Sequence, residues 1–345
     1  MTPEQVKKIK AIQNIYVPSD NLQTILDKLK SIRELSVIDE YEHLPDCMMI
    51  TGETGVGKTS FIKQYLKRNL RFDEPYDEGE RTIVPVLFCE LPKSKHPRPV
   101  ATDLLRELGD ELKGRKGDTN DLLSRLVVQL KASKVELIII DEFQHAIETT
   151  NKEVIKDIGE FFKRLINRTN IPIAFFGMPW SSPILEVNNQ LKRRVRKNKF
   201  KLENYTLDTF EEFQMFLQII EEELPIETES SLWEVDTAFK LFAASSGNLS
   251  DLMDGIIKPA SIEAVKDGSE FIKDEHLIEA AEEHLDFLEG LNPLSMDPDK
   301  VEAKQQKNES YWNPKAPKNS LRVVDATYAK VKFSDLKLKT YLKKR

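Results

Sequence analysis

The chain has 345 residues, of which 40% are hydrophobic and 32% charged, and its formal net charge is −7. That composition is ordinary for a soluble protein rich in surface helix, with enough residues for one large domain or two modest ones. No apolar run approaches the ~20 residues that span a bilayer, and the first residues lack a signal peptide's apolar core. We therefore expect a cytoplasmic protein without membrane contact, in which Cys47 and Cys89 are reduced core thiols.

The first predicted elements are a helix over 20–36 and a strand over 47–50. The helix has its apolar residues on one face. The strand leads into 52–59, Gly-Glu-Thr-Gly-Val-Gly-Lys-Thr, a complete G-x-x-x-x-G-K-[ST] phosphate-binding loop, and a helical pattern follows it. The motif requires this strand, loop and helix context. The sequence therefore predicts a nucleoside triphosphate site rather than a simple glycine-rich turn.

Each part of this loop has an expected role. Its glycines let backbone N–H groups turn toward phosphate oxygens, and the following helix adds its partly positive N-terminus. Lys58 is expected to reach the β- and γ-phosphates of ATP, and the Thr59 hydroxyl to ligate Mg²⁺. The predicted nucleotide-binding residues of the motif are Gly52, Glu53, Thr54, Gly55, Val56, Gly57, Lys58, Thr59 and Ser60.

A second motif follows an acidic loop over 72–80, a strand over 83–90 and helices over 100–112 and 120–131. It is an apolar strand over 135–140 that ends in Asp141 and Glu142. At the carboxyl end of a parallel strand, Asp141 can hold the Mg²⁺ shell through water and Glu142 can polarise the attacking water. After a phosphate-binding loop, this pair favours ATP hydrolysis over mere helix capping, with Lys58 and Glu142 as catalytic candidates.

The remaining elements complete an α/β chain with a helical end. A helix over 152–166 and a strand over 171–177 continue the alternation, and from residue 209 every predicted element is a helix. Such an alternation predicts a parallel sheet with helices on both faces and phosphate at the carboxyl ends of its strands. A small helical lid after this sheet is the AAA+ arrangement. The predicted domains are 1–205 (nucleotide-binding), 206–295 (lid) and 296–345 (a flexible, partner-binding tail).

The tail is basic. Residues 300–345 contain thirteen Lys or Arg and four Asp or Glu, a net charge of +9, and aromatic residues lie among these charges. Two interpretations stay open: a solvated, disordered end, or a segment that becomes ordered on a protein or nucleic-acid partner.

A basic segment, 188–196, follows the strand that ends at Gly177. In AAA+ rings this region often supplies an arginine finger to the γ-phosphate site of the neighbouring subunit. Arg193 and Arg194 are the catalytic candidates, and the sequence does not separate them. The alternative is a basic helix end or a nucleic-acid patch.

Over roughly residues 12–295, the chain resembles the TniB/TnsC AAA+ ATPases of Tn7-like transposons, CRISPR-associated ones included. The phosphate loop and Asp-Glu are common to AAA+ proteins. The resemblance includes Asp-Glu-Phe-Gln-His (141–145), and the features that narrow it to this family are Ile-Tyr-Val-Pro (15–18), Phe-Phe-Gly-Met-Pro (175–179) and Gln-Leu-Lys-Arg-Arg (190–194). Two departures concern the sensor residues of the family. Met178 stands where the family often has threonine, which leaves Ser181 as the polar candidate for the sensor at this strand end. No arginine follows 246–249 to act as a second sensor. Slow turnover is the expected consequence.

The resemblance implies ATP-dependent polymerisation on double-stranded DNA into rings or filaments that connect a target-selection complex to the transposase. It also implies that Tyr16 and Val17 line the adenine pocket, although core packing explains them equally well. Two short basic loops on an acidic body are candidates for phosphate contacts with DNA. Their basic residues are Lys93, Lys95, Arg98, Lys113, Arg115 and Lys116.

Two other classes of function remain open at this point. One is a nucleotide-switched AAA+ protein scaffold that does not bind DNA. The other is a motor or clamp loader of replication or repair, which would share every nucleotide residue named above.

Overall fold

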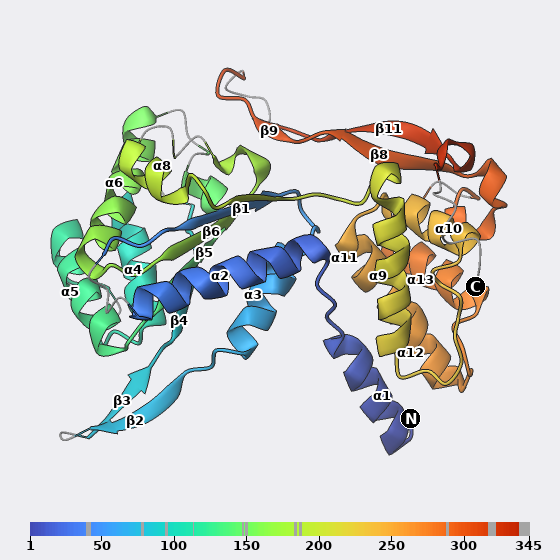
Figure 1. Ribbon diagram of the computed structural model, residues 1–345, viewed down its shortest axis with the longest axis horizontal. Coiled ribbons are helices and arrows are strands. Elements are labelled where there is room, and N and C mark those ends of the chain that lie inside the picture. The colour runs from blue at the N-terminus through green and yellow to red at the C-terminus, as the bar shows by residue number, and fades with distance from the viewer. Residues whose placement is uncertain are drawn as a thin grey trace.

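The structure is a computed structural model. It describes residues 1–38, 43–76, 79–93, 96–112, 114–146, 148, 151–182, 185, 188–287, 290–316 and 322–337. Figure 1 shows an α/β lobe and a helical lobe, with the C-terminal strands lying across both. None of the described helices is long and apolar enough to cross a bilayer.

The α/β lobe is built on a parallel sheet of five strands in the order β4-β5-β6-β1-β7. Their bounds are β1 Met48–Gly52, β4 Val86–Glu90, β5 Leu137–Asp141, β6 Ile173–Gly177 and β7 Lys199–Leu202. Every residue of β5 and β6 is buried, as expected for central strands covered on both faces. The phosphate loop and Asp141 therefore open at the same edge, with the end of β6 between them. The predicted α/β fold is confirmed.

Helices cover both faces of this sheet. One face carries α2 (Asp20–Ile38) and α3 (Lys58–Lys67), whose apolar stripes share a core with the strands. The opposite face carries α4 (Pro97–Glu107), α5 (Thr119–Ala132), α6 (Lys152–Thr169) and α8 (Asn189–Val195). Cys47 and Cys89 are buried in the core on this opposite face and form no disulfide, as predicted.

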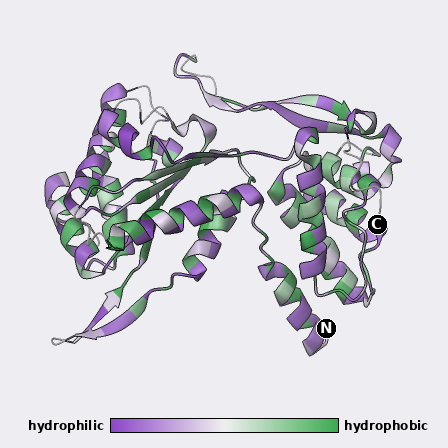
Figure 2. Cartoon of the chain, in the orientation of Figure 1, coloured by the Kyte–Doolittle hydropathy of each residue, from purple (hydrophilic) through white to green (hydrophobic). Residues whose placement is uncertain are grey.

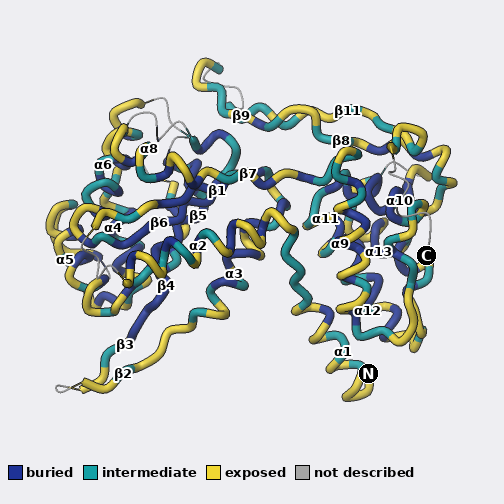
Figure 3. Tube along the Cα trace, viewed as in Figure 1, coloured by how far each residue is buried: buried dark blue, intermediate teal, exposed yellow. Residues whose placement is uncertain are grey.

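The segment that was expected to be an acidic loop forms a hairpin. β2 (Phe72–Tyr76) pairs antiparallel with β3 (Gly79–Ile83), so the expected strand over 83–90 is divided, and β4 begins at Val86. An ion pair between Arg81 and Glu74 links the two strands at 2.5 Å. The hairpin is hydrophilic and extends away from the sheet, with most of its length exposed (Figures 2 and 3).

The helical lobe contains α9 (Phe210–Glu223), α10 (Val235–Ser245), α11 (Leu249–Leu252), α12 (Lys258–Asp267) and α13 (Asp274–His284). A π-helical turn, η4 (Met253–Ile257), separates α11 from α12. Pro259 is the second residue after that turn and has no N–H to donate, which disfavours a regular α-helical ladder there.

The N-terminal helix α1 (Pro3–Asn14) packs on the helical lobe rather than on the sheet. Ile12 is fully buried in the helical core, and Gln5 Nε2 donates to the Val265 carbonyl at 3.0 Å. The domain boundaries predicted from the sequence did not anticipate this contact, because it joins residues far apart in the chain.

Residues 301–316 and 322–337, which we name the C-terminal arm, differ from the expected flexible tail, because four strands lie within these described residues. β8 (Glu302–Asn308) pairs with β11 (Thr327–Lys332), and β9 (Tyr311–Trp312) pairs with β10 (Val323–Val324). Val301 and Ala303 are buried in the helical core, whereas Trp312 packs against the core of the α/β lobe. The arm is ordered because its apolar side chains find partners within this chain. Residues 338–345 lie outside the described part.

Candidate nucleotide-binding site

The backbone of the phosphate loop requires glycine at several positions. Gly55 and Gly57 have φ values of 81° and 97°, in the left-handed region. A Cβ on Gly52 would lie 2.6 Å from the Leu202 carbonyl oxygen of β7. Helix α3 begins at Lys58 without a side-chain cap, so its first N–H groups remain available to an anion.

The Lys58 amine lies inside the curve of this loop. Its Nζ donates to the carbonyls of Gly52 at 2.6 Å and Glu53 at 2.8 Å, and only 9% of the residue is exposed. Burial lowers the pKa of Lys58, and the nearby carboxylates of Asp141 and Glu142 oppose that shift. The amine is thus held beside the acidic pair, where phosphate oxygens of a nucleotide would replace the carbonyls as its partners.

Asp141 ends β5 at the same edge of the sheet. It is 6% exposed, its Oδ1 accepts the Glu142 N–H at 2.8 Å, and burial raises the pKa of its carboxyl. The described residues include no group of three or more His, Cys, Asp or Glu that could hold a metal ion. A magnesium ion fits here only together with nucleotide phosphates, with the Thr59 hydroxyl and the Asp141 carboxylate as the protein groups that would hold it.

Glu142 follows in a left-handed backbone conformation, with φ of 55°. Its Oε2 accepts a hydrogen bond from Gln144 Nε2 and lies 3.6 Å from His145 Nε2. His145 Nδ1 lies 2.7 Å from the Leu91 carbonyl. His145 therefore lies next to Glu142, but its hydrogen bond goes to the backbone of Leu91.

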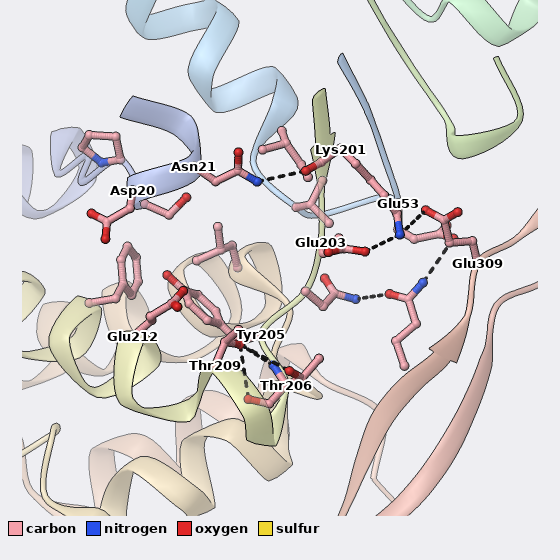
Figure 4. Close-up of a pocket in the computed structure, with 18 of the residues that line it drawn as sticks. Asp20, Asn21, Glu53, Lys201, Glu203, Tyr205, Thr206, Thr209, Glu212 and Glu309 are labelled. Atoms are coloured by element: carbon pink, nitrogen blue, oxygen red, sulfur yellow. Dashed lines mark hydrogen bonds and ion pairs between the residues drawn. The ribbon is translucent and has the colours of Figure 1, made fainter. Parts of the chain in front are cut away.

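A cavity of about 400 Å³ lies beside the phosphate loop, between the two lobes. Figure 4 shows its polar side chains, which come from α2, the β7–α9 connection, α9 and the C-terminal arm. Its apolar lining includes Pro18, Val56, Tyr205, Phe216 and Leu249. A partly apolar cavity next to a phosphate loop suits a nucleotide base.

The two residues expected in an adenine pocket lie near this cavity but do not line it. Its lining begins at Pro18, and Val17 instead packs against the helical core. Tyr16 is partly buried, which raises its pKa to about 12. Their assignment to adenine stays a prediction.

The lid contacts the phosphate loop directly. Asn248 Nδ2 donates to the Thr54 carbonyl at 2.9 Å, and the Ser250 N–H donates to the Gly55 carbonyl at 2.9 Å. A Cβ on Gly55 would lie 2.3 Å from Asn248 Oδ1, so the loop glycine makes room for the lid. No sequence motif assigns a role to Asn248, and Asp251, not an arginine, follows in the same turn.

The C-terminal arm also contacts the loop. The Glu53 carboxylate accepts from the Ser310 N–H at 2.6 Å and from Ser310 Oγ at 2.5 Å. Gln306 Nε2 approaches the same carboxylate at 3.4 Å, and Gln306 Oε1 accepts from Asn204 at 3.0 Å (Figure 4). Asn204 in turn accepts from Asn248 at 3.1 Å. Side-chain hydrogen bonds thus join the loop, the lid and the arm.

The two arginine candidates in α8 have different surroundings. Arg194 is held by structural contacts, because its guanidinium donates to Asn167 Oδ1 at 2.7 Å and burial lowers its pKa. Arg193 is exposed on a small basic surface with Asn189, Lys192 and Arg196.

The structure brings the two basic loops together. Arg98, at the start of α4, donates to the carbonyls of Arg115 at 3.1 Å and Gly117 at 3.2 Å. Lys93, Arg98, Arg115 and Lys116 are all exposed. Lys95 and Lys113 lie outside the described residues.

The end of β6, where a polar sensor was expected, carries Met178. Ser181 is fully buried in the following 3-10 turn, η2 (Pro179–Ser181), and its Oγ has no hydrogen-bond partner among the described residues. A Cβ on Gly177 would lie 2.4 Å from Ser181 Oγ and 3.0 Å from Gln144 Oε1.

Comparisons with known proteins agree with this geometry. The fold is similar to that of the Aeropyrum pernix ORC1 protein in complex with DNA, with a TM-score of 0.51 and 17% identity, covering 80% of this chain and 69% of that one. It is also similar to the Aeropyrum pernix ORC2 protein in ADPNP-ADP complexes, with a TM-score of 0.52, 17% identity and 81% and 72% coverage. The third similar structure is Cdc6p from Pyrobaculum aerophilum, with a TM-score of 0.52, 15% identity and the same coverage.

No curated protein sequence matches the chain significantly. The family model described as "Bacterial TniB protein" matches residues 7–206, which is more than half of the chain and includes the phosphate loop, Asp141, Glu142 and both α8 arginines. The chain belongs to the TniB family, and its fold is that of the AAA+ ATPases.

Proposed function

We propose that this protein is an ATP-dependent transposition regulator, which oligomerises on double-stranded DNA and links target selection to the transposase. The observation that carries the proposal is the convergence of Lys58, Asp141 and Glu142 at one edge of the sheet in a chain of the TniB family. In this account ATP binding drives assembly, and slow hydrolysis reverses it.

The residues have separate roles in hydrolysis. Lys58 leaves the loop carbonyls and binds the β- and γ-phosphates, and the N–H groups at the start of α3 bind further phosphate oxygens. Glu142 accepts a proton from the water whose oxygen attacks the γ-phosphorus, and ADP and phosphate are the products. Magnesium, held through Thr59 and Asp141, would supply charge neutralisation on the phosphates.

Arg193 is the arginine finger in this proposal. Its side chain is exposed, whereas Arg194 is engaged with Asn167 inside its own subunit. A finger must reach the γ-phosphate of a neighbouring subunit, so the exposed side chain is the better candidate. Efficient hydrolysis then requires an oligomer.

DNA binding is assigned to the paired basic loops. Arg98 fixes the 115–117 loop through backbone carbonyls and leaves the Arg115 and Lys116 side chains exposed; Lys93 is exposed as well. Contacts of this kind bind phosphates without reading bases. A protein of similar fold from Aeropyrum pernix was solved in complex with DNA, which supports this part of the proposal.

The test of DNA binding is a charge reversal on this surface. The double variant Arg115→Glu, Lys116→Glu should weaken binding to duplexes of unrelated sequence alike and should make binding less dependent on salt concentration. Lys131→Glu, an exposed residue at the far end of α5, is the control and should cause a smaller loss. Unchanged affinity of the double variant would show that these loops are not the DNA contact, and a wild-type protein without measurable DNA binding would favour a protein scaffold.

The C-terminal arm is proposed to carry the contact with the transposase, and the oligomer surface to carry the contact with the target selector. Tyr311 and Tyr328 are exposed on the arm, 52% and 47% respectively, although most of its apolar side chains are packed. Aromatic side chains exposed on an ordered ribbon suit a protein partner.

A further inference from the structure

We propose that Gln144 is a positioning residue for hydrolysis, which holds the Glu142 carboxylate in place and connects it to the end of β6. This inference rests on the proposed role of Glu142 in ATP hydrolysis. It adds a residue to which neither the motifs nor the family match assigns a role.

The amide of Gln144 makes both of its hydrogen bonds within the site. Its Nε2 donates to Glu142 Oε2, and its Oε1 accepts the Met178 N–H at 3.1 Å. The orientation of the amide is settled by chemistry, because a backbone N–H can only donate and a carboxylate can only accept. Gln144 is 5% exposed, so water competes little for either bond.

The other neighbour of Glu142 cannot take over this role as a neutral ring. His145 Nδ1 lies 2.7 Å from the Leu91 carbonyl and must donate its proton there. In that tautomer the Nε2 atom, 3.6 Å from Glu142 Oε2, is an acceptor and not a donor. Gln144 is therefore the donor that holds Oε2, and the second carboxylate oxygen is the one left to take a proton from water.

The connection to β6 matters because the expected polar sensor is absent there. Met178 occupies the strand end, and its Sδ lies 3.9 Å from Thr54 Oγ1 in the phosphate loop. Gln144 links the backbone at this position to Glu142, so a shift of the strand end on nucleotide binding moves the carboxylate as well. The Gln144 amide thereby couples the end of β6 to Glu142, a role that a polar sensor side chain on β6 would otherwise have.

Gly177 provides the space for this arrangement. A Cβ there would lie 3.0 Å from Gln144 Oε1 and 2.4 Å from Ser181 Oγ, both in the buried interior. An alanine at this position has to displace one of the two side chains. Gly177→Ala should therefore reproduce part of the effect of losing the amide.

The experiment compares Gln144→Met with Gln214→Met in the full chain, by steady-state ATP hydrolysis in the presence of duplex DNA and by nucleotide binding. Methionine keeps the length of glutamine but makes neither hydrogen bond. Gln214 is a matched control: it is 4% exposed, lies in α9 and donates to the Trp233 carbonyl at 2.8 Å, away from the site.

The expected result for Gln144→Met is a fall in kcat of about tenfold to a hundredfold with KM and nucleotide affinity within about twofold. Gln214→Met should lower thermal stability comparably and leave kcat unchanged. Equal kcat for wild type and Gln144→Met, or a parallel loss in both variants, would overturn the positioning role. A wild-type protein that binds ATP but hydrolyses none would instead refute the proposed function.

Discussion

Glu53 and Ser310 join the phosphate loop to the C-terminal arm, although 257 positions separate them in the chain. The Glu53 carboxylate accepts both the backbone N–H and the hydroxyl of Ser310, and Ser310 is only 6% exposed. Hydrogen bonds to a charged acceptor away from water are stronger than those between neutral groups. The arm is therefore fastened at the nucleotide site itself, not only to the outer surface of the two lobes.

The first prediction concerns this connection. Ser310→Ala removes one of the two bonds and should lower the free energy of unfolding by about 1–2 kcal/mol. Limited proteolysis should then cut the arm faster than in the wild type. Ser334→Ala, an exposed serine on the same arm, is the control and should change neither measurement. Equal proteolysis rates for the Ser310 variant and the wild type would contradict a structural role for this contact.

Lys58→Ala should abolish measurable ATP binding, because the phosphates lose the cation buried at the loop. Lys63→Ala provides the comparison, since Lys63 is an exposed residue of the same helix. Binding of a fluorescent ATP analogue measures both. If Lys58→Ala retained wild-type affinity, the loop would not be the nucleotide site.

Glu142→Gln should keep nucleotide binding and lower kcat by at least about 100-fold, because the neutral amide cannot accept the proton from water. The variant should also accumulate in its ATP-bound, assembled form. Glu153→Gln, an exposed residue at the start of α6, is expected to match the wild type. Unaltered turnover in Glu142→Gln would remove the water-polarising role.

Arg193→Ala should lower hydrolysis by about 100-fold or more without weakening ATP binding. Arg196→Ala, which changes another arginine of the same basic surface, should have little effect. Mixing Arg193→Ala subunits with Glu142→Gln subunits should restore activity. The Glu142→Gln subunit keeps Arg193 and supplies the finger, and the Arg193→Ala subunit keeps Glu142 and supplies an intact hydrolysis site. A mixture as inactive as its components would show that Arg193 does not act across a subunit interface.

Arg194→Ala is expected to behave differently from Arg193→Ala. Its guanidinium bonds to Asn167 within the subunit, so its loss should lower stability by about 1 kcal/mol before it affects catalysis. A urea unfolding midpoint separates the two variants. If Arg194→Ala abolished hydrolysis at unchanged stability, the assignment of the finger would move to Arg194.

The parts of the site that could be predicted from the sequence are those with local signals. The phosphate loop, Asp141 and Glu142 lie within short motifs. The structure confirms that the apolar segments before them are strands of the parallel sheet. Gln144 was visible within Asp-Glu-Phe-Gln-His, yet its bond to Met178 joins residues 34 positions apart and has no periodic pattern. The contact of α1 with the helical lobe and the bond of Ser310 to Glu53 also join residues far apart in the chain, so no local pattern predicts them.

The tail was misjudged for a related reason. Its net positive charge and alternating polar residues predict a poor core of its own. In the structure the tail has no core of its own among the described residues. Val301 and Ala303 pack in the helical core, and Trp312 packs against the core of the α/β lobe. The acidic composition of 72–80 likewise predicts a loop, because it gives no sign of the cross-strand pairing of Glu74 with Arg81.

The most direct test of the account is electron microscopy of the full-length protein with duplex DNA, with and without ATP or a slowly hydrolysed analogue. We expect rings or filaments only when nucleotide and DNA are both present, and none with Lys58→Ala. Oligomers that form with ATP alone and ignore DNA, or no assembly under any of these conditions, would contradict the proposed function.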